Sequence, residues 1–251
     1  GKIHIHDLGF PTRVYCSSHS IEYIKKFGLT GLENLSTESR PAKSAQVLIG
    51  HLNTFLASMQ AYYAGALGLG YINIFYAPYL ENATEKEMEQ RAQELIFNGS
   101  QNAFSRGGQT IFLDFNIHSG VPEYLKKVPA IGPGGKYMLI DQKGNRHSLE
   151  EHKSNYLSKQ GHPLMELKLN GRTVLKEVTD SKGNITYDNK ILEELAQKGE
   201  KIVTYEDFEE TARKFANAMM RVWKKGDKSG KIFAFPKCDF HVSEESFNSP
   251  D

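Results

Sequence analysis

The fold class follows from Thr84-Glu-Lys-Glu-Met-Glu-Gln-Arg-Ala-Gln-Glu-Leu-Ile-Phe97 and from the run Gln109-Thr-Ile-Phe-Leu-Asp-Phe-Asn-Ile117 that comes after it. Thr84, with Glu87 three residues later, is a capping box and predicts a helix that runs to about residue 98. The second run is rich in β-branched and aromatic residues and follows the turn Arg106-Gly107-Gly108, which predicts a strand. A helix followed directly by a strand indicates an α/β protein.

The alternation of helix and strand continues on both sides of this unit. Apolar residues recur at spacings of three and four from Ala45 to Ala66, which predicts a long helix that ends in glycines. Thr204 and Asp207 begin a last helix. The other expected elements are extended pieces at about 3–6 and 12–18, helical turns over 21–27, a loop over 29–40, a helix over 71–82 and a strand over Lys231–Val242.

The middle of the chain has a different texture. From residue 137 to about 203, short β-like runs alternate with the turns Gln142-Lys-Gly-Asn145 and Ser181-Lys-Gly-Asn184, and a helix is expected near 190–198. We therefore predict three parts. Residues 1–137 begin an α/β body, residues 138–203 form an inserted module of hairpins and a helix, and residues 204–251 continue the body.

The composition of the 251 residues excludes several classes of protein. The net charge of +1 leaves no cationic surplus for a nucleic-acid-binding face, and 39% hydrophobic residues are typical of a globular core. No apolar run is long enough to span a membrane. The two cysteines, Cys16 and Cys238, are far apart and form neither a disulfide framework nor a CxxC pair, which favours a reducing, cytoplasmic compartment.

Cys16 is the first candidate for chemistry, within Val14-Tyr-Cys-Ser-Ser-His19. One interpretation is a buried structural thiol, because free cysteine is among the most buried residue types. The other is a redox or radical-relay thiol, with the hydroxyl groups of Ser17 and Ser18 beside it to bind a polar substrate. Cys238 is expected to be a packing residue, although the nearby Pro236 suggests a strand end or bulge.

His4 and His6 share one face of the first expected strand, so both imidazoles reach one metal ion if one is present. A metal-dependent hydrolase needs further ligands, and His51, His118 and His241 are available. The simpler interpretation is two histidines in a hydrogen-bond network.

Two further segments suggest ligand binding. Lys43 and Arg40 bracket the start of the long helix and favour an anion such as a nucleotide phosphate there, or are ordinary solvated charges. The glycines before Gln109 allow a backbone to approach a ligand closely. Ile131-Gly-Pro-Gly-Gly-Lys136 lacks the spacing of a phosphate loop and is predicted to be a turn.

Taken together and in order, these segments resemble class III ribonucleotide reductases, the anaerobic, glycyl-radical enzymes. The matching runs are Gly1-Lys-Ile-His-Ile-His-Asp-Leu8, Tyr15-Cys16, Arg40-Pro-Ala-Lys-Ser-Ala45, Tyr76-Ala-Pro-Tyr79, Ser105-Arg-Gly-Gly-Gln-Thr-Ile-Phe112 and Phe235-Pro-Lys237. The resemblance implies a ten-stranded α/β barrel made of two five-stranded halves, of which this chain supplies about the first half. Residues 138–203 do not resemble the family and are expected to be an inserted α+β module.

The resemblance also implies a reaction. A thiyl radical abstracts the 3′-hydrogen of a ribonucleoside triphosphate, the 2′-hydroxyl leaves as water, and a reductant restores the carbon, which supplies deoxyribonucleotides for DNA replication. By this resemblance Cys16 is catalytic, on the 2′-hydroxyl face. Substrate-binding roles are expected for His6, Ser17, Ser18 and Gln109, and binding of an allosteric ATP or deoxynucleotide effector for Lys43 and Arg40.

The remaining parts of such an enzyme are not found in this sequence. The radical cysteine of the finger loop is expected beyond Asp251, and the glycyl-radical motif and the zinc-binding cysteines beside it are absent. We therefore expect a fragment that is inactive without a C-terminal half, in a homodimeric enzyme activated by a radical-SAM iron–sulfur protein. The alternatives are a metal-dependent hydrolase using His4 and His6, an inert nucleotide-binding module, or another glycyl-radical lyase.

Overall fold

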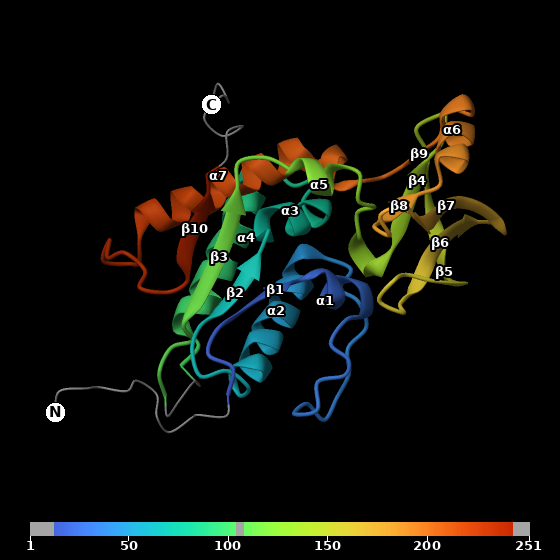
Figure 1. The fold of residues 1–251 in the computed structure, drawn as a ribbon. Helices are drawn as coiled ribbons and strands as arrows, with labels where there is room; N and C mark the ends of the chain where they lie inside the picture. The colour runs from blue at the N-terminus through green and yellow to red at the C-terminus, as the bar shows by residue number, and fades with distance from the viewer. Residues whose placement is uncertain (1–12, 104–107, 243–251) are drawn as a thin grey trace.

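The computed structural model describes residues 13–103 and 108–242, which form two sheets with helices around them (Figure 1). The first sheet is parallel and has the strand order β1-β2-β3-β10. Its strands are β1 (Ser17–Ser20), β2 (Leu67–Gly70), β3 (Leu113–His118) and β10 (Lys237–His241). Within the described residues, β1 and β10 pair on one side only, so this sheet is open at both edges, as part of a barrel requires.

Helices connect the consecutive parallel strands, because parallel neighbours need a crossover. The α/β class predicted from the sequence is therefore confirmed. The connecting elements are α1 (Glu22–Phe27), α2 (Ala45–Gln60), α3 (Ile72–Tyr76), η1 (Ala77–Tyr79), α4 (Glu85–Gln101), α5 (Glu123–Lys126), η2 (Pro133–Gly135), η3 (Tyr205–Phe208) and α7 (Glu209–Lys225). None of the helices in the described part of the chain has the length and apolarity that crossing a bilayer demands.

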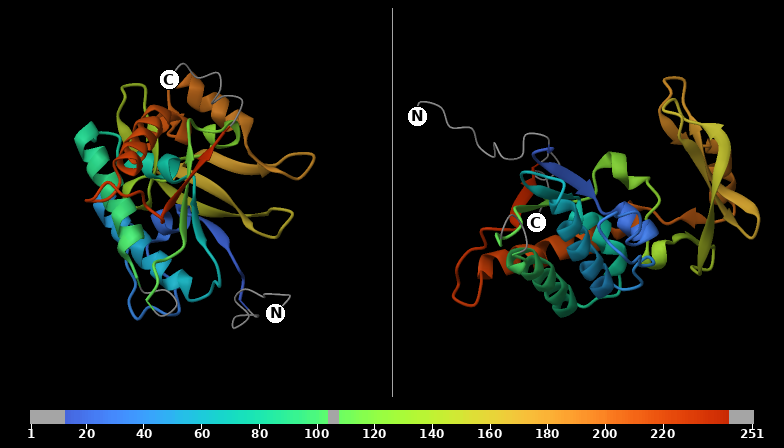
Figure 2. Two further views of the ribbon diagram at one scale, coloured as in Figure 1. Left: turned by 90° about the vertical axis from the view of Figure 1, so that its left-hand side faces the viewer. Right: turned by 90° about the horizontal axis from the view of Figure 1, so that it is seen from below.

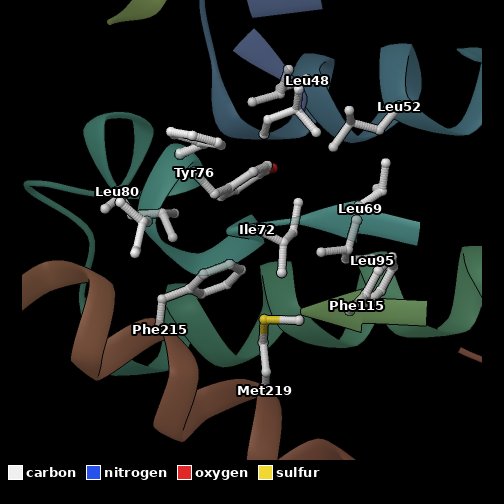
Figure 3. Packing of buried hydrophobic residues seen from close by; sticks show 14 of the residues in the cluster. Leu48, Leu52, Leu69, Ile72, Tyr76, Leu80, Leu95, Phe115, Phe215 and Met219 are labelled. Carbon is white, nitrogen blue, oxygen red and sulfur yellow. The ribbon is translucent and has the colours of Figure 1, made fainter. Parts of the chain in front are cut away.

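The main core lies between the parallel sheet and the long helices α2, α4 and α7. Leu69 of β2 and Phe115 of β3 are fully buried there, together with Leu52, Leu95 and Met219 from the three helices (Figure 3). Side chains alternate between the two faces of a strand. The other face of the sheet therefore presents the intervening residues, which are glycine or polar. The candidate site lies on this polar face.

Local capping explains where several helices begin, as predicted. The hydroxyl of Thr84 accepts from the backbone of Glu87, whose carboxylate accepts from the backbone of Thr84 at 2.8 Å, so the capping box starts α4. Thr204 and Asp207 form the second predicted box, which starts η3 and leads into α7. The helical turns predicted over 21–27 are present as α1, which is followed by its C-cap residue Gly28.

The long helix predicted to reach Ala66 ends at Gln60 instead. Beyond it, the backbone N–H groups of Ala64 and Gly65 donate to the carbonyls of Val14 and Tyr15, so the chain has already turned towards the sheet. The strand β2 that follows was not predicted. Tyr62 and Tyr63 keep the helical spacing without being helical, and Tyr63 forms an isolated bridge with Val14.

Other boundaries also differ from the prediction. The helix expected over 71–82 is divided into α3 and η1, because Pro78 has no backbone N–H to continue the α-helix. The extended piece expected over 12–18 becomes a strand only at Ser17, after an isolated bridge at Val14. The strand expected over Lys231–Val242 begins directly after Pro236, and that expected over 109–117 begins at Leu113. The piece expected at 3–6 lies outside the described residues.

Between β3 and α7 the chain forms the second sheet, which stands beside the body (Figure 2). This sheet is antiparallel, in the order β8-β7-β6-β5-β4-β9, and has its own core around Leu139, Leu167 and Leu195. Its elements are β4 (Tyr137–Ile140), β5 (Arg146–Leu157), β6 (Pro163–Leu169), β7 (Arg172–Thr179), β8 (Ile185–Tyr187), α6 (Asn189–Gln197) and β9 (Lys201–Ile202). The hairpin turns and the helix expected in this region are present. The division of the chain at residues 138 and 203 stays a prediction.

Candidate active site

The face of the parallel sheet turned away from the helices carries an ordered set of small and polar residues, here called the open face. Strand register places Ser18, Gly68, Asp114 and Lys237 in one row across the four strands. The next row contains Gly70, Asn116 and Asp239, with Ser20 at its β1 end. Both open-face positions of β2 are glycines, so the middle of this face is bare backbone between polar walls on β1 and β3.

Cys16 is exposed and lies at the start of β1, two residues before Ser18. Its sulfur accepts a hydrogen bond from the backbone N–H of Ala66 at 3.2 Å. A Cβ atom on Gly65 would lie 2.5 Å from this sulfur, so only glycine permits the close approach. The exposure of the thiol does not fit the interpretation of Cys16 as a buried structural residue. The role of Cys16 as a reactive thiol stays a prediction.

The two serines after Cys16 lie on opposite faces of β1. Ser18 belongs to the open face, two residues from Cys16, whereas Ser17 shares the helix-facing side with His19. His19 packs edge-on against the rings of Phe55 and Tyr63, and burial lowers the pKa of its imidazole. The structure therefore brings Ser18, and not Ser17, to the side that carries the polar rows.

Gln109 and His6 complete the predicted substrate-binding set. Gln109 is exposed and lies four residues before β3. Because Ser17, Leu67 and Leu113 are in register, Gln109 lies at the same end of the sheet as Cys16. His6, like His4, lies outside the described residues.

The other end of the open face closes with stacked rings, of which the sequence suggested His118 and His241 only as further metal ligands. The ring of His118 lies between those of Tyr71 and His241, with both centroid distances 4.6 Å. Tyr71 also shares a hydrogen bond of 2.6 Å with the hydroxyl of Tyr124. Burial and the neighbouring His241 lower the pKa of His118 to about 4, so its imidazole is neutral at pH 7.

Asn116 and Asp239 were also missed. For Asn116 the available signal was the alternation of Asp114 and Asn116 with apolar residues at the end of the expected strand 109–117. The amide Nδ2 of Asn116 donates to Asp239 Oδ2 at 3.4 Å. Burial, followed by the charge of Asp239, raises the pKa of Asp114 on the same face. These polar groups are chemically suited to a ligand that carries hydroxyl groups.

Metal ligation is not supported by the donors that the structure describes. In residues 13–103 and 108–242, no three His, Cys, Asp or Glu side chains converge on a point where they can hold a metal ion. His118 and His241 stack ring on ring, and His51 lies within α2. His4 and His6, the pair on which the hydrolase alternative depends, lie outside the described residues.

A second region lies around the start of α2, where Lys43 precedes the helix cap Ser44. Lys43 and Lys136 both flank Gly134, each with its Cγ about 4 Å from the position of a Cβ atom there. Beside them is a cavity of about 560 Å³ between the body and the second sheet, lined by Lys136, Arg91 and Arg146 among others. The predicted turn over 131–136 is present as η2.

The cations of this region, of which Arg91, Lys136 and Arg146 line the cavity, are not equally available. Arg146 forms a two-pronged ion pair with Glu81, and Arg91 pairs with Glu94 at 2.6 Å. Neither Lys43 nor Lys136 has an ion pair with a described residue. Arg40 is exposed, and its carbonyl lies against Gly28.

Cys238 has the environment expected of a packing residue. It is half-buried and packs against the main core, with its sulfur 3.5 Å from that of Met220. Burial, followed by the charge of Asp239, raises the pKa of the thiol. It therefore stays protonated at neutral pH and serves as a matched control for Cys16.

The family of this chain follows from a comparison with models of known protein families. The family described as anaerobic ribonucleoside-triphosphate reductase matches the chain over residues 1–251, including the second sheet. No curated protein matches it. A solved structure of the anaerobic ribonucleotide reductase from Thermotoga maritima with dATP bound in the specificity site is similar to this chain, with 21% identity and a TM-score of 0.40, over 46% of this chain and 21% of that one.

Two further solved structures give similar values. The Thermotoga maritima reductase in complex with dATP and CTP has 21% identity and a TM-score of 0.41, over 46% of this chain and 20% of that one. A structure described as anaerobic ribonucleotide reductase has 20% identity and a TM-score of 0.41, over 46% and 19% of the two chains. The chain spans about a fifth of the length of the solved structures that it matches.

Proposed function

Because the chain belongs to the anaerobic ribonucleoside-triphosphate reductase family, we propose that it supplies part of the catalytic barrel of an enzyme that reduces ribonucleoside triphosphates to deoxyribonucleotides. The four parallel strands, open at both edges, would be continued by the remaining strands of a ten-stranded barrel. The open face would then line the interior of that barrel.

The observation that carries this proposal is the exposed thiol of Cys16 at the edge of a polar, glycine-floored sheet face. In the proposed reaction, a glycyl radical outside this chain would generate a thiyl radical on a further cysteine, and that thiyl radical would abstract the 3′-hydrogen. Cys16 would donate its proton to the 2′-hydroxyl, so that the C2′–O bond breaks and water leaves, and an external reductant, formate or a small thiol protein, would supply the two electrons of the net reduction, in part through the Cys16 sulfur. The N–H of Ala66 holds the sulfur in place, and Ser18 and Gln109 bind the substrate from the same side. His6 is proposed as a further substrate contact. Ser17, which was also predicted to bind substrate, lies on the opposite side of β1 with His19 and has no part in this proposal.

The proposal is tested by Cys16→Ser in the complete reductase that contains this chain, after radical activation under anaerobic conditions. We expect loss of nucleotide reduction by at least about 100-fold with little change in substrate affinity, because a hydroxyl is a much weaker acid and reductant than a thiol. The matched control is Cys238→Ser, which removes the half-buried thiol and should keep turnover. Undiminished reduction by Cys16→Ser would contradict the role of Cys16.

We also propose that Lys43 and Arg40 bind the phosphates of an ATP or deoxynucleotide effector beside the cavity near α2. The support is the position of Lys43 at the positive end of the α2 dipole and its neighbour across Gly134, Lys136, which lines the cavity. Lys43→Ala should weaken binding of a deoxynucleoside triphosphate about tenfold, as expected for one charge-assisted contact. Lys224→Ala, at the far end of α7, is the control. Equal effects of the two variants would contradict this assignment.

The complete enzyme is proposed to be a cytoplasmic homodimer that works with a radical-SAM iron–sulfur activating protein. The glycyl-radical residue and a structural zinc site are assigned to polypeptide other than this chain. Residues 138–203 are proposed to be an inserted module between two parts of the barrel, residues 1–137 and 204–251.

A further inference from the structure

The bare backbone of β2 divides the open face into two facing walls. A Cβ atom on Gly70 would lie 3.5 Å from Ser18 Oγ on β1 and 4.0 Å from Asn116 Oδ1 on β3. On Gly68 it would lie 3.2 Å from Ser18 Oγ. The two oxygen atoms therefore border the same small volume above β2, which a side chain on Gly70 would fill.

Both oxygen atoms are free to accept a hydrogen bond. In the described part of the chain, no hydrogen bond engages Ser18 Oγ or Asn116 Oδ1. The other end of the Asn116 amide donates to Asp239 Oδ2, which fixes the orientation of Oδ1 towards Gly70. Two acceptors across a side-chain-free floor suit a ligand that presents several hydroxyl donors, as a sugar does.

The position of this volume relative to the thiol is also suitable. Cys16 lies two residues before Ser18, and two residues of a strand span about 6.6 Å. A sugar ring above Gly68 and Gly70 is therefore within reach of the sulfur at one end. At the other end, the stacked ring of His118 follows Asn116 on the same face and closes the volume.

We infer that Asn116, oriented by Asp239, binds a sugar hydroxyl of the nucleotide on the floor formed by Gly68 and Gly70, opposite Ser18. This inference rests on the proposed function and adds the residues that recognise the ribose. Asn116 thereby distinguishes a ribonucleotide from a nucleotide that lacks the hydroxyl, because the loss of the donor leaves Oδ1 unpaired.

The test measures equilibrium binding of a ribonucleoside triphosphate and of its deoxy counterpart to the substrate site of the complete reductase. Gly70→Ala should weaken ribonucleotide binding by at least about tenfold, because the methyl group occupies the sugar volume. It should leave the thermal midpoint nearly unchanged, since its nearest contacts are ordinary ones. The matched control is Gly50→Ala on α2, where a Cβ atom meets nothing within 4 Å.

Asn116→Ala gives the second readout. The preference for ribonucleotide over deoxynucleotide should fall about tenfold, while effector binding stays as in the parent protein. Unchanged ribonucleotide affinity in Gly70→Ala, or an unchanged preference in Asn116→Ala, overturns the inference but not the proposed function. Failure of the parent protein to bind any ribonucleoside triphosphate overturns both.

Discussion

Lys25 in α1 is a fully buried lysine, and its titration has a measurable effect on stability. Its ammonium nitrogen lies 3.1 Å from the hydroxyl of Tyr205 and 5.0–5.8 Å from the ring centres of Phe75, Tyr79 and Tyr205. Burial lowers the pKa of Lys25 from 10.5 to about 7, although Glu22 offsets part of this effect. In the folded chain, the side chain of Lys25 is therefore a neutral amine above pH 7.

The size of the effect follows from the difference in pKa between the two states. Above pH 7 the unfolded chain holds a proton on Lys25 that the folded chain has released, so the free energy of unfolding rises with pH. Each pH unit in this window contributes about 1.36 kcal/mol. Between pH 7 and pH 9 the gain is about 2–3 kcal/mol. Below pH 7 both states carry the proton, and the gain is absent.

The assay compares urea unfolding of the parent protein and Lys25→Met at pH 7, 8 and 9. Methionine keeps the apolar contacts and does not titrate, so the parent should gain about 2–3 kcal/mol relative to this variant across the window. Burial raises the pKa of Tyr79 and of Tyr205, so neither tyrosine in the folded chain ionises below pH 9.

The control is Lys224→Met, which alters an exposed lysine of α7 and should keep the pH dependence of the parent. Parallel pH profiles for the parent and Lys25→Met would refute the reasoning, because they would mean that the buried amine keeps its proton on folding.

Two other positions give direct tests of the architecture. Asn73 is fully buried, donates to the carbonyls of His118 and Ala212 and accepts from the N–H of His118, so Asn73→Ala should lower the free energy of unfolding by about 3 kcal/mol in urea. An unchanged urea midpoint in Asn73→Ala would show that these three hydrogen bonds do not contribute to stability. Gly65→Ala places a Cβ atom 2.5 Å from the Cys16 sulfur and should change the alkylation rate of that thiol severalfold, whereas Gly50→Ala should not. Equal alkylation rates in the two variants would contradict the close contact between Gly65 and the Cys16 sulfur.

The elements predicted best from the sequence are those that local contacts decide. The capping box of Thr84 and Glu87 is contained within four residues, and the structure has α4 beginning there. The strand β2 was missed because Leu67-Gly-Leu-Gly70 has no β-branched or aromatic residue. Its conformation comes from pairing with β1 and β3, which are remote in the sequence.

The same division holds for the candidate site. Cys16 and Ser18 are two positions apart in the sequence and were singled out from it. Asn116 and Asp239 are separated by 123 positions and meet only through the register of β3 and β10. Ser17 and Ser18 lie on opposite faces of the sheet because both belong to β1. The sequence predicted an extended piece from about residue 12, several residues before β1 begins.

The second sheet leaves and rejoins the body at nearly one point, and this affects how the gene can change. The N–H of Ala130 donates to the carbonyl of Val203 at 3.0 Å, and Pro129 bridges Thr204. A short turn can therefore connect these residues in place of the whole second sheet, without redirecting β3 or α7. The length of chain between them can grow or shrink over evolutionary time while the parallel strands keep their order, because the two ends of any such segment already lie side by side.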